Sequence, residues 1–324
     1  MTSKVRSFEA AAALVPDGAV VSIGSSAGVN CPDRMLRAIG ERFAREGAPA
    51  RLTLLLPIAA GDMYGVKGID HLAQRGLIDT VIAGSFPSGP SSMPPPRIWE
   101  MIGANEVAAY NVPSGLLFDM HRDAAARRAG VLTKVGLETF VDPQLQGCKI
   151  NQAAADRGEI VRRVDFAGDT WLHFPNIPPD VAIVRGTTAD ERGNISMEHE
   201  GALLGNVDLA LAARNSGGLV IAQVKRLTTA GTLPTQRVHI PSTLVDVVVV
   251  DPEQQQATEI AYDPTISGET QRPLSSFGPP PCASTSSSRG ARRWSSQAGT
   301  RSTSGSASRR WCPPSSSTRS CRER

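Results

Sequence analysis

The chain changes composition abruptly at about Ser275. Residues 1–274 carry leucine, valine and acidic residues in periodic segments, whereas residues 275–324 contain no Leu, Ile, Val, Met, Tyr, Lys or Asp. That tail holds sixteen Ser and nine Arg against a single acid, Glu323. Such a segment cannot bury enough apolar surface to offset the entropy of ordering it. We therefore expect a folded domain over residues 1–274 and a disordered Ser/Arg-rich tail over 275–324.

Two explanations of the tail compete: a natural basic extension, and a shifted reading frame in a GC-rich gene. Moving the frame back by one base turns TCN serine codons into codons for Val, Leu, Ile or Phe. In that frame Cys282–Ser296 can read L-R-L-D-V-V-V-A-R-R-A-A-M-E-L, and Thr300–Arg309 can read D-A-V-N-L-G-I-G-V-P. A helix-like segment followed by a glycine-punctuated strand favours the shifted frame.

The net charge of +3 comes from the tail, because its nine Arg and one Glu leave 25 basic and 30 acidic residues in residues 1–274. An acidic folded part argues against a nucleic-acid partner, which needs clustered Lys and Arg. No apolar run approaches the roughly 18–20 residues of a membrane span, and no secretory signal is visible. Cys31 and Cys148 show no metal or disulfide spacing. We predict a reduced, cytoplasmic, soluble protein.

Short apolar runs alternate with amphipathic segments over residues 1–274. Strands are predicted at Ala19–Ile23, Leu52–Leu56, Thr80–Ala83, Val107–Asn111, Val181–Arg185, Gly218–Val224 and Val245–Val250. Helices are predicted at Asp33–Arg45, Ile69–Arg75, Ile98–Ala104, Ala124–Arg128 and Leu203–Arg214. This alternation predicts an α/β fold, a doubly wound and mostly parallel sheet covered on both faces. The less regular segment Gly147–Trp171 is expected to form an inserted antiparallel patch.

Turn-rich segments follow several of the predicted strands. Six of them stand out: Ser22–Asp33, Gly61–Gly76, Ala109–Gly115, Val131–Gly147, Arg185–Glu198 and Asn215–Val224. The first, S-I-G-S-S-A-G-V-N-C-P-D, leads from a strand into a helix, where backbone N–H groups can bind an anion or stabilise an oxyanion. It lacks G-x-x-x-x-G-K, so it is not a nucleoside-triphosphate loop. Each segment alone is equally compatible with a simple turn.

Together, the order and spacing of these segments resemble the first half of a family I CoA-transferase of the fused-chain acetate/propionate (short-chain acyl) type. The resemblance covers nearly all of Val20–Glu269. Its most specific pieces are T-K-V-G-L-E-T-F-V-D-P, R-G-T-T-A-D-x-x-G-N, N-S-G-G and the closing S-G-E at Ser267–Glu269. The N-L-G-I-G of the shifted frame is similar to the strand and glycine loop that open the second half of that family.

The resemblance implies ping-pong transfer of CoA between a short-chain acyl-CoA and a carboxylate, such as acetate, propionate, butyrate or a 3-oxoacid. A glutamate carboxylate forms an acyl anhydride and then a glutamyl-CoA thioester, without metal or nucleotide cofactor. Because a carboxylate is a weak nucleophile, the site needs CoA binding energy and an oxyanion hole. The G-F-x-G-like loop of the family corresponds to Ser25–Gly28, which makes the N–H groups of Ala27 and Gly28 the candidate donors. The chain departs from the pattern at Ser25 and Ser26.

The family's nucleophile lies in an E-x-G context of the second half, and the sequence reaches Arg324 without such a position. Glu191 reproduces E-x-G but sits in A-D-E-R-G-N, which favours a structural β-turn. Glu138 and Glu269 are also expected to be structural or substrate-lining. The chain is thus expected to be a truncated first half, with three alternatives: an inactive remnant, a CoA-binding domain, or an acyl-CoA hydrolase of the same superfamily. A separate chain could instead supply the second half, as in two-subunit members of the family.

The resemblance also implies which residues line the substrate. These are Gly24, Asn30, Gly61, Asp62, Asn111, Gly115 and Glu138. The five histidines (His71, His121, His173, His199 and His239) show no metal-binding spacing, so no metal site is predicted. The implied partners are an acyl-CoA, a carboxylate and, in the intact family, further copies of the same protein in a homo-oligomer.

Overall fold

A nine-stranded sheet forms the centre of residues 1–272, one of two compact units into which the chain divides, the other being residues 273–324. The structure, a computed structural model, describes residues 3–62, 64–87 and 94–277. The predicted tail and its frame-shifted segments therefore lie almost wholly outside the described residues. Within the second unit, the described part holds one short 3-10 helix, Leu274–Ser276.

Seven strands of the sheet run parallel, in the spatial order β12-β10-β8-β1-β2-β3-β4. Their bounds are β1 Val20–Ile23, β2 Leu52–Leu56, β3 Ile78–Ala83, β4 Ala108–Asn111, β8 Val181–Asp190, β10 Leu219–Thr228 and β12 Val247–Val250. Two short strands, β9 (Ile195–Ser196) and β11 (Val238–Ile240), extend the far end of β8 in antiparallel fashion. The predicted α/β fold with a mostly parallel sheet is therefore confirmed.

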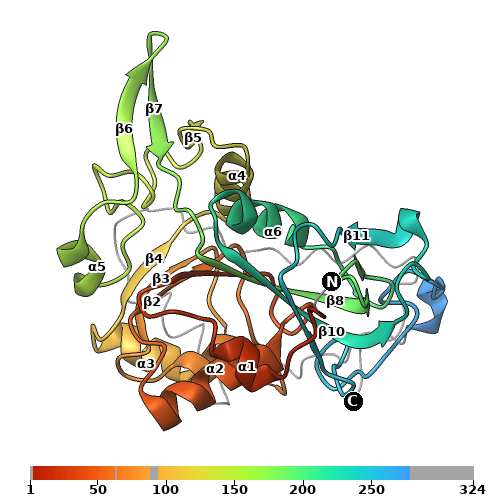
Figure 1. Cartoon of the computed structure of the whole chain (residues 1–324). Helices are drawn as coiled ribbons and strands as arrows, with labels where there is room; N and C mark the ends of the chain where they lie inside the picture. The colour runs from red at the N-terminus through yellow and green to blue at the C-terminus, as the bar shows by residue number, and fades with distance from the viewer. Residues whose placement is uncertain (1–2, 63, 88–93, 278–324) are drawn as a thin grey trace, which may run out of the picture. The chain divides into compact units, whose positions relative to one another are not determined.

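Helices cover both faces of this sheet (Figure 1). One face carries α1 (Phe8–Ala12), α2 (Asp33–Glu46), the 3-10 helix η1 (Gly68–Leu72) and α3 (Arg97–Gly103). The other carries α4 (Ser114–Ala125) and α6 (Asn206–Asn215). A further helix, α5 (Gln152–Arg157), packs beside β4, and a short 3-10 helix, Thr235–Arg237, precedes β11.

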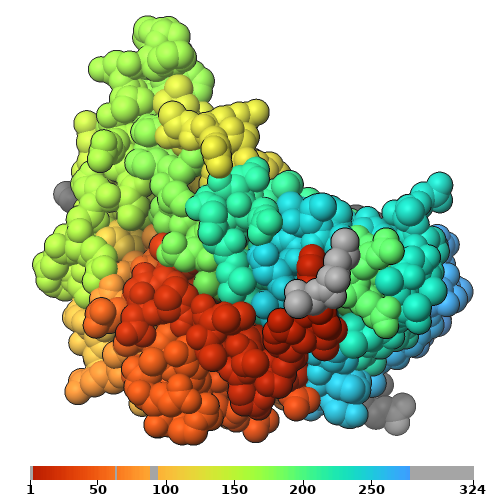
Figure 2. All heavy atoms as spheres, viewed as in Figure 1, coloured from red at the N-terminus to blue at the C-terminus, as the bar shows by residue number. Residues whose placement is uncertain are grey.

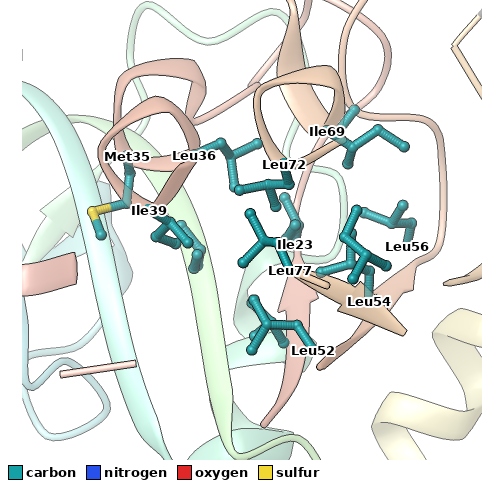
Figure 3. Packing of buried hydrophobic residues seen from close by; sticks show 14 of the residues in the cluster. Ile23, Met35, Leu36, Ile39, Leu52, Leu54, Leu56, Ile69, Leu72 and Leu77 are labelled. Atoms are coloured by element: carbon teal, nitrogen blue, oxygen red, sulfur yellow. The ribbon is translucent and has the colours of Figure 1, made fainter. Parts of the chain in front are cut away.

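The strand sequences explain the two layers, because alternate residues of a strand face opposite sides of a sheet. In β2, Leu52, Leu54 and Leu56 join the cluster under α2 and η1, whereas Leu55 faces the cluster under α4. Figure 3 shows the first cluster, in which aliphatic side chains of β1 and β2 meet those of α2 and η1. Strands buried on both faces read as continuous apolar runs, as the sequence does here.

Three strands form a separate antiparallel sheet in the order β5-β7-β6. They are β5 (Val131–Thr133), β6 (Arg162–Phe166) and β7 (Asp169–Phe174). This sheet is the predicted antiparallel patch, although it begins earlier and ends later than Gly147–Trp171. Figure 1 shows the β6–β7 hairpin extending away from the parallel sheet.

Three predicted helices are corrected by the structure. α4 is Ser114–Ala125 rather than Ala124–Arg128, since it begins directly after Pro113 and Arg127 has a left-handed φ of 53°. The predicted helix over Ile69–Arg75 is only the 3-10 helix Gly68–Leu72. α6 begins at Asn206 rather than Leu203 because Leu204 and Gly205 have positive φ angles, which a right-handed helix cannot accommodate.

A buried hydrogen bond joins β1 to α4. The His121 Nδ1 lies 2.6 Å from the Leu117 carbonyl and therefore donates to it, so the Nε2 accepts from the Ser22 hydroxyl at 2.7 Å. Both residues are buried, and burial lowers the pKa of His121 from its ordinary value of 6.5 to about 4. The pair is a structural link, because no solvent reaches it.

We expect this histidine to make the fold acid-sensitive. Between pH 6.5 and 4, His121 is protonated in the unfolded chain but neutral in the native protein. The free energy of unfolding therefore falls as the pH falls through that window. From pH 7 to pH 5 the loss is about 2 kcal/mol. Urea unfolding of the wild type and of His121→Gln at pH 7 and pH 5 measures this loss. It is the amount by which the unfolding free energy of the wild type falls more than that of the variant between the two pH values. An equal fall in both proteins would contradict the assignment.

Candidate functional site

The order of strands reverses between β1 and β8. From β1 the chain adds β2, β3 and β4 on one side, and from β8 it adds β10 and β12 on the other. In open parallel sheets, ligands bind outside the carboxyl ends of the strands at such a switch point. The loops that leave β1 and β8 are therefore the first place to look for a site.

The loop after β1 and the loop after β2 are joined backbone to backbone. The Ala27 N–H donates to the Ala59 carbonyl at 2.7 Å, and the Gly61 N–H donates to the Ala27 carbonyl at 2.9 Å. Farther along the first loop, a β-carbon on Gly28 would lie 2.2 Å from the Asp62 Oδ2. The structure thus brings together four of the predicted residues, Ala27, Gly28, Gly61 and Asp62.

The two predicted oxyanion donors differ. The Ala27 N–H is already bonded to Ala59, so in this structure it is not free to bind a substrate oxygen. The Gly28 N–H has no acceptor in the described part of the chain. Of the predicted pair, only Gly28 therefore has an N–H group without an acceptor among the described residues, and the residue is buried.

Two buried asparagines flank the same loop. Asn30 has a left-handed φ of 57° and donates its Nδ2 to the Ala202 carbonyl at 2.7 Å. Asn206, at the start of α6, donates to the Leu203 carbonyl at 3.1 Å, and its Oδ1 would lie only 2.1 Å from a β-carbon on Gly24. The Oδ1 atoms of both asparagines are buried without a hydrogen-bond donor among the described residues. Each such acceptor costs about 1–3 kcal/mol, which marks the switch point as polar beyond what folding requires.

The remaining predicted lining residues lie farther along the sheet edge. Asn111, at the end of β4, donates to the Gly84 carbonyl at 3.1 Å and so ties β4 to the loop after β3. Gly115 lies in the first turn of α4, where a β-carbon would meet nothing within 4 Å. Glu138 is exposed in the turns after β5, and its N–H donates to Asp142. Within residues 3–62, 64–87 and 94–277, no hydrogen bond or ion pair joins Glu138 to the loops after β1 and β2.

A buried polar network holds the loop after β1 in place. The Arg185 side chain, on β8, donates to the Cys31 carbonyl at 3.0 Å and pairs with Glu200 at 3.1 Å. Burial raises the pKa of Glu200, although Arg185 acts in the opposite direction. Gln223, on β10, accepts the Met35 N–H at 3.0 Å and thereby caps the first turn of α2. Sequence reasoning missed these residues, and the available signal was a polar residue inside a buried apolar run.

A hollow of about 490 Å³ lies beside this network, at the start of α2. None of the predicted site residues lines it. Its arginines are already paired: Arg34 with Asp251 at 3.1 Å, Arg37 with Glu41 at 2.7 Å and Arg185 with Glu200. The hollow therefore offers no unpaired arginine for the phosphates of CoA, and we do not assign it to substrate.

The other acidic candidates occupy turns. Glu191 lies in the β8–β9 turn, exposed, and accepts the Ala230 N–H at 3.1 Å. The turn itself is held by Asp190, which accepts the N–H groups of Arg192 and Asn194. Glu269 is exposed and accepts a hydrogen bond from the Tyr262 hydroxyl. Over residues 3–62, 64–87 and 94–277, no group of three or more His, Cys, Asp or Glu side chains could hold a metal ion, and no helix could cross a membrane.

These features define an α/β protein of the doubly wound class with a polar, glycine-rich loop pair at its switch point. The family described as Coenzyme A transferase matches residues 5–251. The chain belongs to this family, whose members are transferases.

Individual relatives agree with the family. The caffeate CoA-transferase of Acetobacterium woodii is 35% identical over 278 residues, which are 85% of this chain and 51% of that enzyme. The solved acyl-CoA transferase YdiF of Escherichia coli O157:H7, a thioester complex with CoA, superimposes with a TM-score of 0.77 at 32% identity, covering 84% of this chain and 52% of that one. The acetate CoA-transferase subunit alpha of E. coli K12 is 24% identical, over 79% of this chain and all of that subunit. The chain thus spans about half the length of the first two.

Proposed function

We propose that the described domain is the first half of a CoA-transferase that moves CoA between a short-chain acyl-CoA and a carboxylate. The observation that carries this proposal is the loop pair at the switch point. There the Gly28 N–H has no acceptor among the described residues, and backbone hydrogen bonds fix the loops after β1 and β2 to each other. The relatives named for acetate and caffeate support a carboxylate acceptor.

The transfer would proceed through two covalent intermediates on a glutamate, first an anhydride and then a thioester. A glutamate carboxylate attacks the thioester carbonyl, CoA thiolate leaves, and an acyl-glutamyl anhydride forms. The thiolate then attacks the glutamyl carbonyl and releases the first carboxylate, which leaves a glutamyl-CoA thioester for the acceptor to enter by the reverse sequence. We propose that the Gly28 N–H donates to the oxygen that gains charge, and that Gly24, Asn30, Gly61 and Asp62 shape the space beside it.

The glutamate would come from the half of the relatives that this chain does not match. We propose that this half is encoded in the shifted frame, and sequencing the gene across codons 270–285 tests that proposal; an intact frame would refute it. We also propose that the intact protein is a homo-oligomer and that it works in a reduced, cytoplasmic setting. The reduced setting is compatible with Cys31 and Cys148 being free and buried.

The function is tested by exchange of label from acetyl-CoA into propionate. We expect exchange when the full chain is co-expressed with the part of the A. woodii enzyme that it does not match, and none with either piece alone. Exchange by this chain alone would contradict the proposal that the glutamate comes from the half of the relatives that the chain does not match. Failure of a co-purified complex to exchange would overturn the proposed function.

Two glycines that both lie close to Thr258 give a matched pair of variants. A β-carbon at Gly28 would lie 2.2 Å from Asp62 and 2.4 Å from Thr258, whereas one at Gly65 would lie 3.6 Å from Thr258, an ordinary contact. In the complex, we expect Gly28→Ala to lower exchange about 100-fold, because misplacing a catalytic group by 1 Å costs that much. Gly65→Ala should exchange like the wild type. Equal rates for the two variants would remove Gly28 from the site.

A further inference from the structure

Strand β6 forms an open edge of the small antiparallel sheet. The sheet order β5-β7-β6 leaves the outer side of β6 without a neighbouring strand among the described residues. In Figures 1 and 2 the light-green hairpin of β6 and β7 extends away from the helices and strands of the parallel sheet. An open edge exposes unpaired backbone groups that readily pair with another strand.

The turn of the hairpin fixes which backbone groups face outward. Ala167 and Gly168 have φ angles of 52° and 83°, as in a two-residue turn whose flanking residues, Phe166 and Asp169, form a hydrogen-bonded pair. Hydrogen-bonded and non-bonded pairs alternate along an antiparallel ladder. Arg163 and Asp165 therefore direct their N–H and C=O groups away from β7, toward the open edge.

The sequence of β6, R-R-V-D-F, is self-complementary in one register only. When two copies pair along this edge in antiparallel fashion, the backbone groups of Arg163 and Asp165 must form the hydrogen bonds between them. The twofold axis that relates the two copies can therefore pass through Arg163, Val164 or Asp165. An axis at Arg163 or at Asp165 places like charges opposite each other. An axis at Val164 places Arg163 opposite Asp165 of the second copy, twice. Opposite charges on facing residues stabilise a strand pair, and like charges destabilise it.

The side chains on the outer face of the hairpin are suited to the same pairing. Val164 and Trp171 face each other across β6 and β7, and Phe166 is 59% exposed. The register at Val164 would place Arg162 of one copy opposite Phe166 of the other, a cation–π arrangement. Arg163 and Asp165 have partners within the chain, Asp142 at 3.6 Å and Thr170 at 3.0 Å, and both of these lie on the hairpin's own sheet or beside it.

We propose that β6 pairs with β6 of a second copy of this chain, antiparallel and centred on Val164, to give one continuous six-stranded sheet. Arg163 and Asp165 would exchange backbone hydrogen bonds and opposite charges across the axis. Neither residue belongs to the proposed CoA-transfer site, so the proposal stands apart from that function.

Charge reversal tests the register. Sedimentation velocity of the full chain over a concentration series gives the self-association constant, and urea unfolding confirms that each variant is folded. Asp165→Arg and Arg163→Asp should each weaken association at least about tenfold, since each creates two like-charge pairs. The double variant Arg163→Asp/Asp165→Arg restores opposite charges and should associate within about threefold of the wild type. A monomeric wild type, unweakened single variants or an unrestored double variant would each overturn the proposal.

Discussion

The Arg185→Met variant should unfold with a free energy about 3–5 kcal/mol lower than the wild type. In the native protein the Arg185 side chain is 4% exposed, and the side chain of its partner Glu200 is 1% exposed. Removing the guanidinium leaves the buried Glu200 carboxylate with only Gln254 as a donor among the described residues, and it frees the Cys31 carbonyl. Urea unfolding at pH 7 measures the loss.

Two controls separate burial from charge. The same substitution at Arg37, which pairs with Glu41 at the surface, should cost less than about 1 kcal/mol. The double variant Arg185→Met/Glu200→Gln removes both charges and should recover part of the loss. If Arg185→Met and Arg37→Met cost the same, the network around Arg185 does not hold the loop.

Substitution of Gly68 should be nearly as damaging. Its φ is 56°, and a β-carbon would lie 2.1 Å from the Ala60 carbonyl oxygen and 2.4 Å from the Gly61 nitrogen. These are backbone atoms that cannot rotate away, so the loop after β2 must shift. We expect Gly68→Ala to lower the unfolding free energy by about 3–4 kcal/mol.

Gly47 provides the control for the backbone strain alone. It ends α2 with a φ of 71°, and a β-carbon there would meet nothing within 4 Å. Gly47→Ala should therefore cost about 1 kcal/mol. The difference between the two variants in thermal or urea unfolding isolates the collision at Gly68, and equal losses would mean that the loop gives way freely.

Local patterns in the sequence predicted most of the parallel sheet. Leu52–Leu56 is predicted and observed with identical bounds, and Asp33 begins a helix in both. Strand β8 was predicted to stop at Arg185 but continues to Asp190. Its polar second half, G-T-T-A-D, is buried by pairing with β9 and β10, which no local pattern reveals.

The site was less predictable because its geometry depends on distant residues. Gly28 must be small because Thr258, far along the chain, packs against it. The Ala27 N–H was predicted to be free, yet its acceptor belongs to the loop after β2. The buried pair of Arg185 and Glu200 likewise depends on tertiary packing that excludes water from both groups.

The place of β1 in the sheet also sets an order of events as the protein forms. β1 pairs on one side with β2 but on the other with β8, and the Val20 N–H reaches the Asp180 carboxylate across 160 residues. The ribosome synthesises β1–β4 long before β8, so one edge of β1 stays unpaired while the antiparallel sheet of β5, β6 and β7 is being made. Closing so long a loop is slow. Closure at the switch point must therefore wait for β8, and until then a nascent chain is exposed to strand exchange along that edge of β1.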